Sequence, residues 1–177
     1  MRRIAVMGTT CSGKSTLARR LADRLDLGYV ELDALYWGEK WREPEAEEFR
    51  RRVEPIIGGD AWVVDGNYSS TLRGLVLRRA DTVVWLDLSL ARVLWRVWRR
   101  TIRRILKREE LWSGNRETWR NALLSRNSLF VWALRTHGRF RRRLPQRLAS
   151  DEYAHVQLVR LRSPREIERW LANVPQS

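Results

Sequence analysis

The sequence feature that most restricts the fold of this chain is a glycine loop near its N-terminus. Residues 8–15 read Gly-Thr-Thr-Cys-Ser-Gly-Lys-Ser and match the pattern G-x-x-x-x-G-K-[ST] in full. A short apolar run, residues 3–7, precedes the loop, and residues 14–25 follow it with apolar side chains at helical spacing. This order of strand, loop and helix is the context that the motif requires, so a chance glycine-rich turn is disfavoured. The sequence therefore predicts a loop that wraps the phosphates of a nucleotide.

The chemistry of such a loop assigns roles to its side chains. The glycines let several backbone N–H groups converge on one anion, and the helix N-terminus adds partial positive charge. We expect Lys14 to reach the β- and γ-phosphates of ATP, and the Ser15 hydroxyl to bind Mg²⁺. Cys11 is the only cysteine, so a disulfide within the chain is impossible. The predicted nucleotide site comprises Gly8, Thr9, Thr10, Cys11, Ser12, Gly13, Lys14, Ser15 and Thr16.

The rest of the chain alternates between predicted strands and predicted helices. Further strands are predicted at residues 28–32, 61–64, 82–87 and 156–161, and further helices at 44–57 and 164–171. Strands that alternate with helices are typical of a parallel sheet covered on both faces, which is an α/β fold. The length of 177 residues fits one compact domain, so we expect residues 1–177 to form a single domain.

Acidic residues follow three of these strands, where parallel strands open into a crevice. Asp33 is placed to orient an acceptor hydroxyl and take its proton, or to cap a helix over residues 34–37. Asp65 ends the run Trp-Val-Val-Asp and has the form of a magnesium-orienting carboxylate. The following Gly-Asn makes a hairpin turn the competing interpretation. Asp87 is a second candidate for magnesium or a cap for the next helix.

Nearly all of the net charge of +14 lies between residues 92 and 143, where 16 Lys and Arg face three Glu. Residues 89–106 have the apolar spacing of a long helix, whose other positions are filled by arginine. Ser-Gly-Asn at 113–115 interrupts the pattern, and a further helix is predicted from Trp119 to a break at Gly138. The segment is interpreted as a nucleic-acid surface or as a helix on anionic lipid.

Four stretches of the chain resemble the adenylate-kinase-related P-loop proteins known as topology modulation proteins. They are residues 8–16, Leu-Asp-Ala-Leu-Tyr-Trp at 32–37, Trp-Val-Val-Asp-Gly-Asn-Tyr at 62–68 and Ala-Asp-Thr-Val-Val-Trp-Leu-Asp at 80–87. The resemblance continues through Arg-Ser-Pro-Arg-Glu at 162–166 and so covers nearly the whole chain. Adenylate kinases carry an arginine in a D-G-F-P-R string where this chain has Asp-Gly-Asn-Tyr-Ser. That difference argues against ordinary AMP binding, although Arg73, Arg78 or Arg79 offers charge from another register.

The resemblance implies a P-loop NTPase of the nucleoside-monophosphate-kinase type, with three layers and five parallel strands in the order 2-3-1-4-5. It also implies that residues 92–143 form a helical, arginine-rich lid. In such kinases lid arginines close over the transferred phosphoryl group, here Arg96, Arg99, Arg100, Arg103 and Arg104, with Arg116 just beyond. We take Arg96, Arg100 and Arg104 as catalytic candidates. The loop at Ser163 and Pro164 is expected to cover adenine.

These features together predict an ATP- and Mg²⁺-dependent phosphotransferase that acts on a small-molecule or nucleotide acceptor. Its expected catalytic residues are Lys14, Asp33, Arg96, Arg100 and Arg104, with Ser15 and Asp65 at the metal. The alternative is a P-loop ATPase that binds nucleic acid through residues 92–143. No apolar stretch approaches the length of a membrane span, and the N-terminus lacks a secretory signal, so we expect a cytoplasmic protein.

Overall fold

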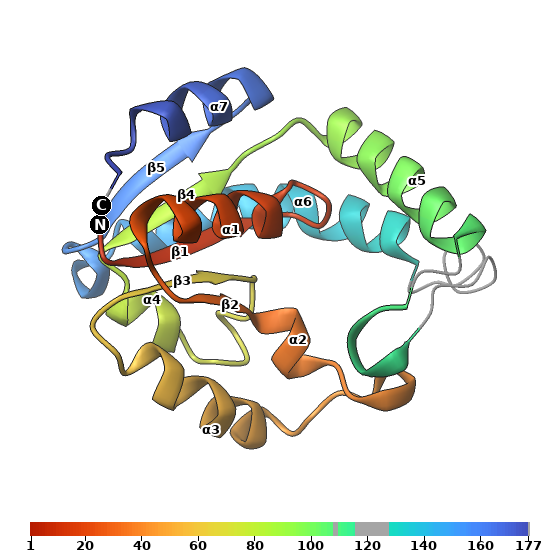
Figure 1. Ribbon diagram of the computed structural model, residues 1–177, viewed down its shortest axis with the longest axis horizontal. Helices are drawn as coiled ribbons and strands as arrows, with labels where there is room; N and C mark the ends of the chain where they lie inside the picture. Colours follow the sequence, from red (N-terminus) through yellow and green to blue (C-terminus); the bar gives the residue numbers. More distant parts are fainter. Residues whose placement is uncertain (108–109, 116–127, 177) are drawn as a thin grey trace.

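The computed structural model describes residues 1–107, 110–115 and 128–176, and its core is a five-stranded parallel sheet. Figure 1 shows the strands surrounded by helices, with both termini at one end of the sheet. The strands are β1 (Arg3–Gly8), β2 (Tyr29–Glu31), β3 (Trp62–Asp65), β4 (Thr82–Leu86) and β5 (Gln157–Leu161). Their order is β2-β3-β1-β4-β5, and every pair is parallel. This confirms the predicted fold class and rules out a hairpin after Asp65.

Seven α-helices and three short 3-10 helices are described around this sheet. The α-helices are α1 (Lys14–Leu25), α2 (Leu32–Tyr36), α3 (Ala46–Ile57), α4 (Leu75–Arg79), α5 (Leu90–Leu106), α6 (Leu129–Leu148) and α7 (Pro164–Asn173). The short helices are η1 (Glu39–Trp41), η2 (Trp112–Gly114) and η4 (Asp151–Tyr153).

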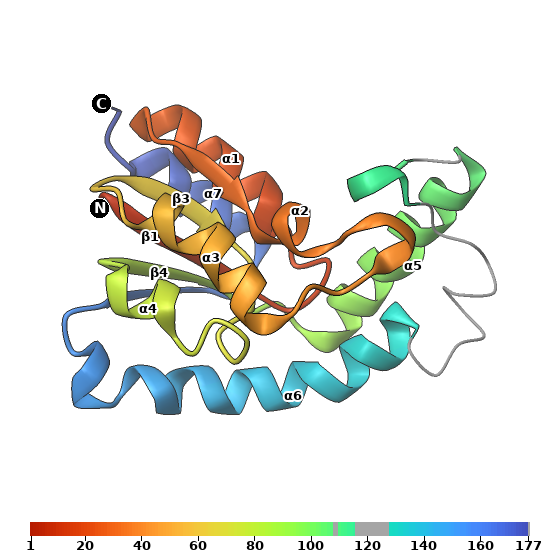
Figure 2. The ribbon, with the colours of Figure 1, turned by 90° about the horizontal axis from the view of Figure 1, so that it is seen from below.

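The side chains of β1 alternate between two hydrophobic cores, one on each face of the sheet. Ile4 and Val6 pack with α1, α5 and α7, whereas Ala5 and Met7 pack with α3 and α4. Because successive side chains of a strand point to opposite faces, a strand covered on both faces must be apolar throughout. Figure 2 shows α6 running along the side of the sheet opposite α1 and α7. The three-layer arrangement therefore follows from the apolar strands.

Helix α6 differs from its prediction because it runs through Gly138 and ends only at Leu148. Gly138 is exposed and a Cβ added there would meet no atom within 4 Å. Glycine inside a helix costs only about 1 kcal/mol. Burial of Ala133 and Leu144 in the two hydrophobic cores offsets that cost. The predicted start at Trp119 lies outside the described residues.

The segment that the sequence assigns to the lid has two structurally different parts. Helix α5 lies beyond the carboxyl ends of the strands, while α6 packs on the sheet as part of a layer (Figures 1 and 2). Phe140 of α6, for example, packs against Trp85 of β4 with ring centroids 6.3 Å apart. Of the described residues assigned to the lid, arginines of α5 border the cavity described below, whereas α6 belongs to a layer of the fold. None of the described helices combines the length and apolar composition needed to cross a membrane.

Candidate active site

The glycine loop connects β1 to α1 and forms the floor of a large cavity. Gly13 adopts a left-handed conformation, with φ of 99°, directly before the first turn of α1. A side chain at this position would be strained, and its Cβ would lie 3.2 Å from an Arg96 nitrogen. The Lys14 ammonium donates a hydrogen bond of 3.2 Å to the Thr9 carbonyl oxygen. The loop is therefore curled back on itself in the shape that the motif predicts.

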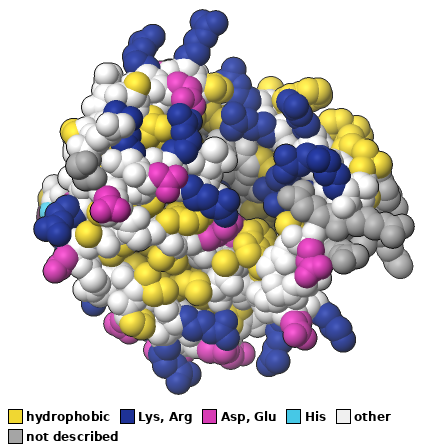
Figure 3. Space-filling model, in the orientation of Figure 1, with side chains coloured by type: hydrophobic (Ala, Val, Ile, Leu, Met, Phe, Trp, Pro, Cys, Tyr) yellow, Lys and Arg dark blue, Asp and Glu magenta, His cyan; other side chains and the backbone are white. Residues whose placement is uncertain are grey.

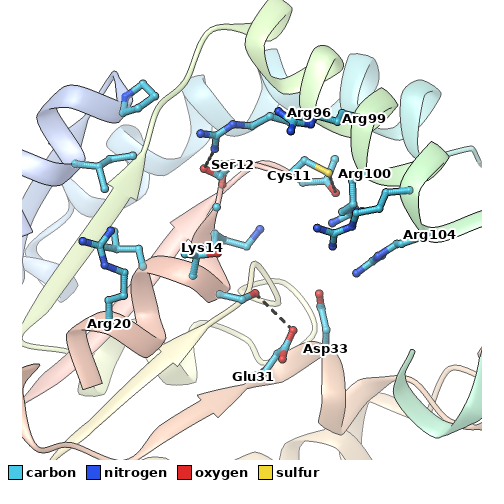
Figure 4. A pocket seen from close by; sticks show the side chains of 18 of the residues that line it. Cys11, Ser12, Lys14, Arg20, Glu31, Asp33, Arg96, Arg99, Arg100 and Arg104 are labelled. Atoms are coloured by element: carbon cyan, nitrogen blue, oxygen red, sulfur yellow. Dashed lines mark hydrogen bonds between the residues drawn. The ribbon is translucent and has the colours of Figure 1, made fainter. Parts of the chain in front are cut away.

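The cavity above the loop has a volume of about 540 Å³. Figure 3 shows Lys and Arg side chains around a hollow on this face, and Figure 4 shows the cavity from close by. Among the predicted site residues, its walls contain Thr10, Cys11, Ser12, Gly13, Lys14, Ser15, Thr16, Asp33, Arg96, Arg100, Arg104 and Pro164. Gly8, Thr9, Asp65 and Ser163 do not line it directly. The fold thus brings residues from both ends of the chain to one volume.

Lys14 lies between carboxylates and arginines. Burial lowers the pKa of its ammonium group, and the charges of Asp33 and Asp65 oppose that shift. Figure 4 shows Lys14, Asp33 and Arg100 pointing into the same space from the loop, α2 and α5. An anion bound there would contact cations on two sides, while an uncharged hydroxyl could approach Asp33. This arrangement suits a phosphoryl group in transit between two oxygens.

Ser15 and two carboxylates form an oxygen-rich cluster below Lys14. The Ser15 hydroxyl donates a hydrogen bond of 2.6 Å to Asp65, and Glu31 lies 3.5 Å from the same hydroxyl. Tyr29 also donates to Asp65, at 3.2 Å. Hydroxyl and carboxylate oxygens are the ligands that Mg²⁺ prefers, with phosphate oxygens and water completing its coordination. The residues present therefore fit a magnesium ion beside the β- and γ-phosphates.

The Asp65 carboxyl group is almost completely buried, and burial raises its pKa to about 6. The hydrogen bond from Ser15 and the charge of Lys14 act in the opposite direction. Burial disfavours the ionised form of a carboxyl group, and a cation that binds beside the group stabilises that form. A cation bound beside Asp65 would therefore stabilise the ionised form of its carboxyl group.

Asp33 is held in position by a side chain from the segment that follows β3. The Tyr68 hydroxyl donates a hydrogen bond of 2.7 Å to Asp33. Burial, followed by the charge of Asp33, raises the Tyr68 pKa above its ordinary value, so the phenol stays protonated and keeps donating. Asp33 lies in the first turn of α2, whose N-cap is Glu31, so the alternative interpretation of Asp33 as an N-cap is wrong.

Helix α5 presents a row of arginines to the cavity. Those that line it are Arg96, Arg99, Arg100, Arg103 and Arg104. Arg96 donates a hydrogen bond of 2.7 Å to the carbonyl oxygen of Ser12, which joins α5 directly to the glycine loop. In Figure 4, Arg100 and Arg104 extend from α5 into the space above Asp33, whereas Arg96 extends toward Ser12. Arg116 lies outside the described residues.

The segment after α5 is fastened to the segment after α2. Asn115 is buried, accepts a hydrogen bond of 2.9 Å from the Trp41 N–H and donates one of 2.9 Å to the Gly38 carbonyl. Ser113 donates to the Trp37 carbonyl oxygen at 2.9 Å. These bonds define a clasp between residues 110–115 and 37–42. Trp112, within the clasp, lines the cavity next to the arginines.

Curated proteins related to this chain include shikimate kinases. The chain is 31% identical over 121 residues to one from Sulfurihydrogenibium sp., a match that covers 60% of this chain and 73% of the relative. The chain therefore belongs to the family of P-loop kinases that includes these shikimate kinases. A shikimate kinase from Gloeobacter violaceus is 34% identical over 106 residues, covering 52% of this chain and 59% of the relative. No protein-family model matches the chain.

Solved structures of kinases share the fold of this P-loop kinase over nearly its whole length. A shikimate kinase from Bacteroides thetaiotaomicron has a TM-score of 0.55 at 14% identity, covering 97% of this chain and 94% of the other. A gluconokinase from Sinorhizobium meliloti has a TM-score of 0.53 at 18% identity, covering 97% and 91%. Identity this low shows the shared fold alone. The comparisons therefore support a kinase, but they do not support the narrower branch suggested by the sequence strings.

Several residues of the kinase site were not singled out in the sequence. Glu31 joins the oxygen cluster, Tyr68 holds Asp33, and Asn115 makes the clasp. Asn67 holds the glycine loop, because its side chain accepts from the Gly8 N–H at 3.2 Å and donates to the Gly8 carbonyl. Glu31, two residues before Asp33, was the one with a usable signal. The partners of the others lie too far away in the sequence to be inferred.

Three alternatives considered for acidic and basic residues of the kinase are wrong. Asp87 neither faces the cavity nor caps α5, because its buried carboxylate pairs with Arg141 at 2.7 Å and Arg160 at 2.6 Å. Arg78, considered as an acceptor-site charge, instead donates to Glu152 and to the Arg73 carbonyl oxygen. Ser163 caps α7 by accepting from the Glu166 N–H, and only its neighbour Pro164 reaches the cavity.

Proposed function

We propose that this kinase transfers the γ-phosphoryl group of ATP, with Mg²⁺, to a hydroxyl of a small-molecule acceptor. The observation that supports the proposal is the convergence of Lys14, Asp33 and the α5 arginines on one cavity above the glycine loop. The loop backbone and Lys14 bind the β- and γ-phosphates, and Pro164 borders the side where adenine is proposed to lie. Mg²⁺, when bound at Ser15 and Asp65, would neutralise charge on the phosphate oxygens.

Asp33 is the proposed residue that orients the acceptor. It accepts the proton of the acceptor hydroxyl as the oxygen forms its bond to the γ-phosphorus. The bond from the γ-phosphorus to the bridging oxygen breaks, and ADP leaves with the electron pair. Arg96, Arg100 and Arg104 stabilise the negative charge that spreads over the transferred group.

The acceptor is proposed by chemical class only, a molecule with a free hydroxyl that fits between Asp33 and the arginines. The shikimate kinases and the gluconokinase described above suggest the first compounds to test, namely shikimate and gluconate. Membership of the topology modulation branch is also a proposal, supported by the strings at 32–37 and 62–68. The expectations of a single domain with a lid over residues 92–143 and of a cytoplasmic location stay predictions.

The test is ATP consumption by the purified kinase with Mg²⁺ across hydroxyl compounds, including those two and nucleoside monophosphates. One acceptor should stimulate turnover and be recovered phosphorylated. Lys14→Ala should reduce the rate on the order of 100-fold, because the γ-phosphate loses its cation. Glu47→Gln, an exposed change on α3, serves as the control. Stimulation by DNA or RNA with no phosphorylated small molecule would favour the nucleic-acid ATPase instead.

A further inference from the structure

The outer face of α5 carries an apolar stripe that the proposed kinase reaction does not use. Trp95, Trp98, Ile102 and Leu106 follow one another at spacings of three and four residues, which places them along one side of the helix. Trp95 is 62% exposed, Trp98 42% and Leu106 72%. Among the described residues, seven large hydrophobic side chains are exposed, and five of them lie on α5 and α6. This concentration marks an interaction surface.

The stripe is separate from the faces of α5 already assigned. Val93, Val97 and Thr101 are buried against the rest of the molecule, and the arginines with Arg96 among them line the cavity. The four stripe residues belong to neither group. Helix α5 therefore has three sides, of which one packs, one faces the phosphates and one is apolar and turned to solvent.

Positive charge surrounds this apolar side. Helix α5 contains six arginines and no acidic residue. Arg92, in its first turn, and Lys107, directly after its end, are exposed at the two ends of the stripe. Figure 3 shows hydrophobic and Lys or Arg side chains gathered at the upper right, over α5. A surface of this composition complements a partner that is apolar inside and anionic at its boundary.

We propose that the outer face of α5 binds the surface of an anionic lipid bilayer. Helices that lie in a membrane interface combine a strongly charged side, rich in Lys and Arg, with an apolar side of Trp, Phe and Leu. Trp is suited to this depth because its ring is apolar and its N–H finds a partner among the headgroups. Arg92 and Lys107 reach the phosphate layer while their stems cover apolar surface.

Nucleic acid fits this face less well than lipid does. Single strands bind in positively charged grooves with aromatic rings that stack on the bases. The stripe lies along one side of a single helix and, within the described residues, forms no groove with a second element, and half of it consists of the aliphatic residues Ile102 and Leu106, which cannot stack. The densest row of arginines faces the cavity and not the stripe. Insertion among acyl chains uses all four stripe residues, whereas base stacking uses two.

The experiment is co-sedimentation of the whole chain with phosphatidylcholine vesicles that contain or lack phosphatidylglycerol. Binding should require phosphatidylglycerol and weaken as salt is added, because counter-ions screen the attraction. The double variant Trp95→Ser, Trp98→Ser should bind at least about tenfold more weakly. Leu158→Ser is the matched control, since Leu158 is 39% exposed on the edge strand β5, and it should bind like the unchanged chain.

The contribution of the positive charge beside the stripe is tested by vesicle binding of Arg92→Glu. Its matched control is Arg165→Glu on the exposed side of α7. Only the first should weaken vesicle binding. Trp98 packs against Phe130 with ring centroids 6.3 Å apart, so Trp95→Ser alone is included in case the double variant unfolds. Circular dichroism and ATP binding verify that each variant is folded, because the proposed ATP site does not include the substituted residues.

Three results would overturn the proposal. One is equal binding to vesicles with and without phosphatidylglycerol, or none to either. Another is vesicle binding that survives the loss of Trp95. The third is that the Trp95→Ser variant loses oligodeoxynucleotide binding or self-association while its vesicle binding is unchanged. That result would show that the stripe binds another partner.

Discussion

At the scale of single residues, the site depends on carboxylates whose surroundings differ. Asp65 is buried beside Ser15 and has its pKa raised to about 6, whereas Asp33 is held by the Tyr68 hydroxyl. In the proposed reaction, Asp65 becomes charged when a cation binds beside it, and Asp33 faces the acceptor. The strand ends supply both, but the roles are set by the neighbours that the fold provides.

The Asp65 pKa predicts how the stability of the ligand-free kinase changes with pH. A pKa raised in the folded state means that the folded protein holds this proton more tightly than the unfolded chain does. The stabilising contribution is complete below about pH 4 and is lost as pH rises through about 6. Urea unfolding of the wild type and Asp65→Asn should therefore differ by a pH-dependent amount, on the order of 3 kcal/mol over that range.

Magnesium and nucleotide should reverse that loss, because a bound cation favours the ionised carboxylate. We expect MgATP to bind more tightly as pH rises through about 6, and Asp65→Asn to flatten this dependence. A variant that retains the full pH dependence of both stability and MgATP affinity would show that another group is responsible.

Tyr68→Phe tests whether the phenol positions Asp33. Removing the 2.7 Å hydrogen bond should lower kcat about tenfold and leave the KM for ATP unchanged, because the loop is not altered. In an Asp33→Asn background the same change should have little further effect. Tyr36→Phe is the matched control, since its hydroxyl donates to the exposed Glu43. Equal effects of Tyr68→Phe in both backgrounds would indicate a packing role only.

At the scale of elements, the clasp is the described contact between the residues after α5 and the residues after α2. It rests on Asn115, and the backbone on both sides is strained, with positive φ at Lys40, Trp41 and Ser113. Such conformations persist only where other contacts hold them. The clasp therefore joins the residues after α5 to the residues after α2 at a conformational cost, and Trp112 within it lines the cavity.

Asn115→Ala should release the clasp. The Trp41 N–H loses its acceptor, so its amide hydrogen should exchange with solvent at least about tenfold faster. Turnover should fall by a similar factor because the arginines of α5 are less well held over the phosphates. Ser113→Ala, which removes one exposed hydrogen bond to Trp37, should have the smaller effect on both. Unchanged exchange at Trp41 would mean that other contacts maintain the clasp.

At the scale of the whole molecule, Asp87 joins elements that are far apart in the chain. Its carboxylate is fully buried and pairs with Arg160 of β5 and Arg141 of α6. Arg160 also lies over the Trp85 ring, 4.4 Å from its centroid. This cluster fixes the C-terminal third of the chain to β4, and so it supports the strand order from which the cavity is built.

Asp87→Asn should destabilise the fold by about 2 kcal/mol. The two arginines remain partly exposed, so they are solvated when the carboxylate is lost, which limits the cost. Glu152→Gln is the control, because Glu152 pairs with Arg78 at the surface and should change the free energy of unfolding by less than about 1 kcal/mol. Equal effects of the two substitutions in urea unfolding would contradict the structural role of Asp87.

The sequence by itself determined the glycine loop, the alternation of strands and helices, and the arginine-rich segment. These are local patterns, because a loop motif, a period of apolar residues and a charge count need only neighbouring positions. The family resemblance supplied the strand order, which the structure confirms. The sequence also named Lys14, Ser15, Asp33 and Asp65, whose convergence the structure places at one end of the sheet.

Only the tertiary structure decided which partners surround those residues. Tyr68 lies 35 positions from Asp33, and Asn115 lies 74 positions from Trp41. No local pattern encodes contacts at such separations, because they depend on how β3 and α5 are placed against β1. The same reason explains why the prediction for Asp87 was wrong. Its position at a strand end suggested a place in the cavity or a helix cap. Arginines from two distant elements enclose it instead, and the path of α6 through Gly138 brings one of them there.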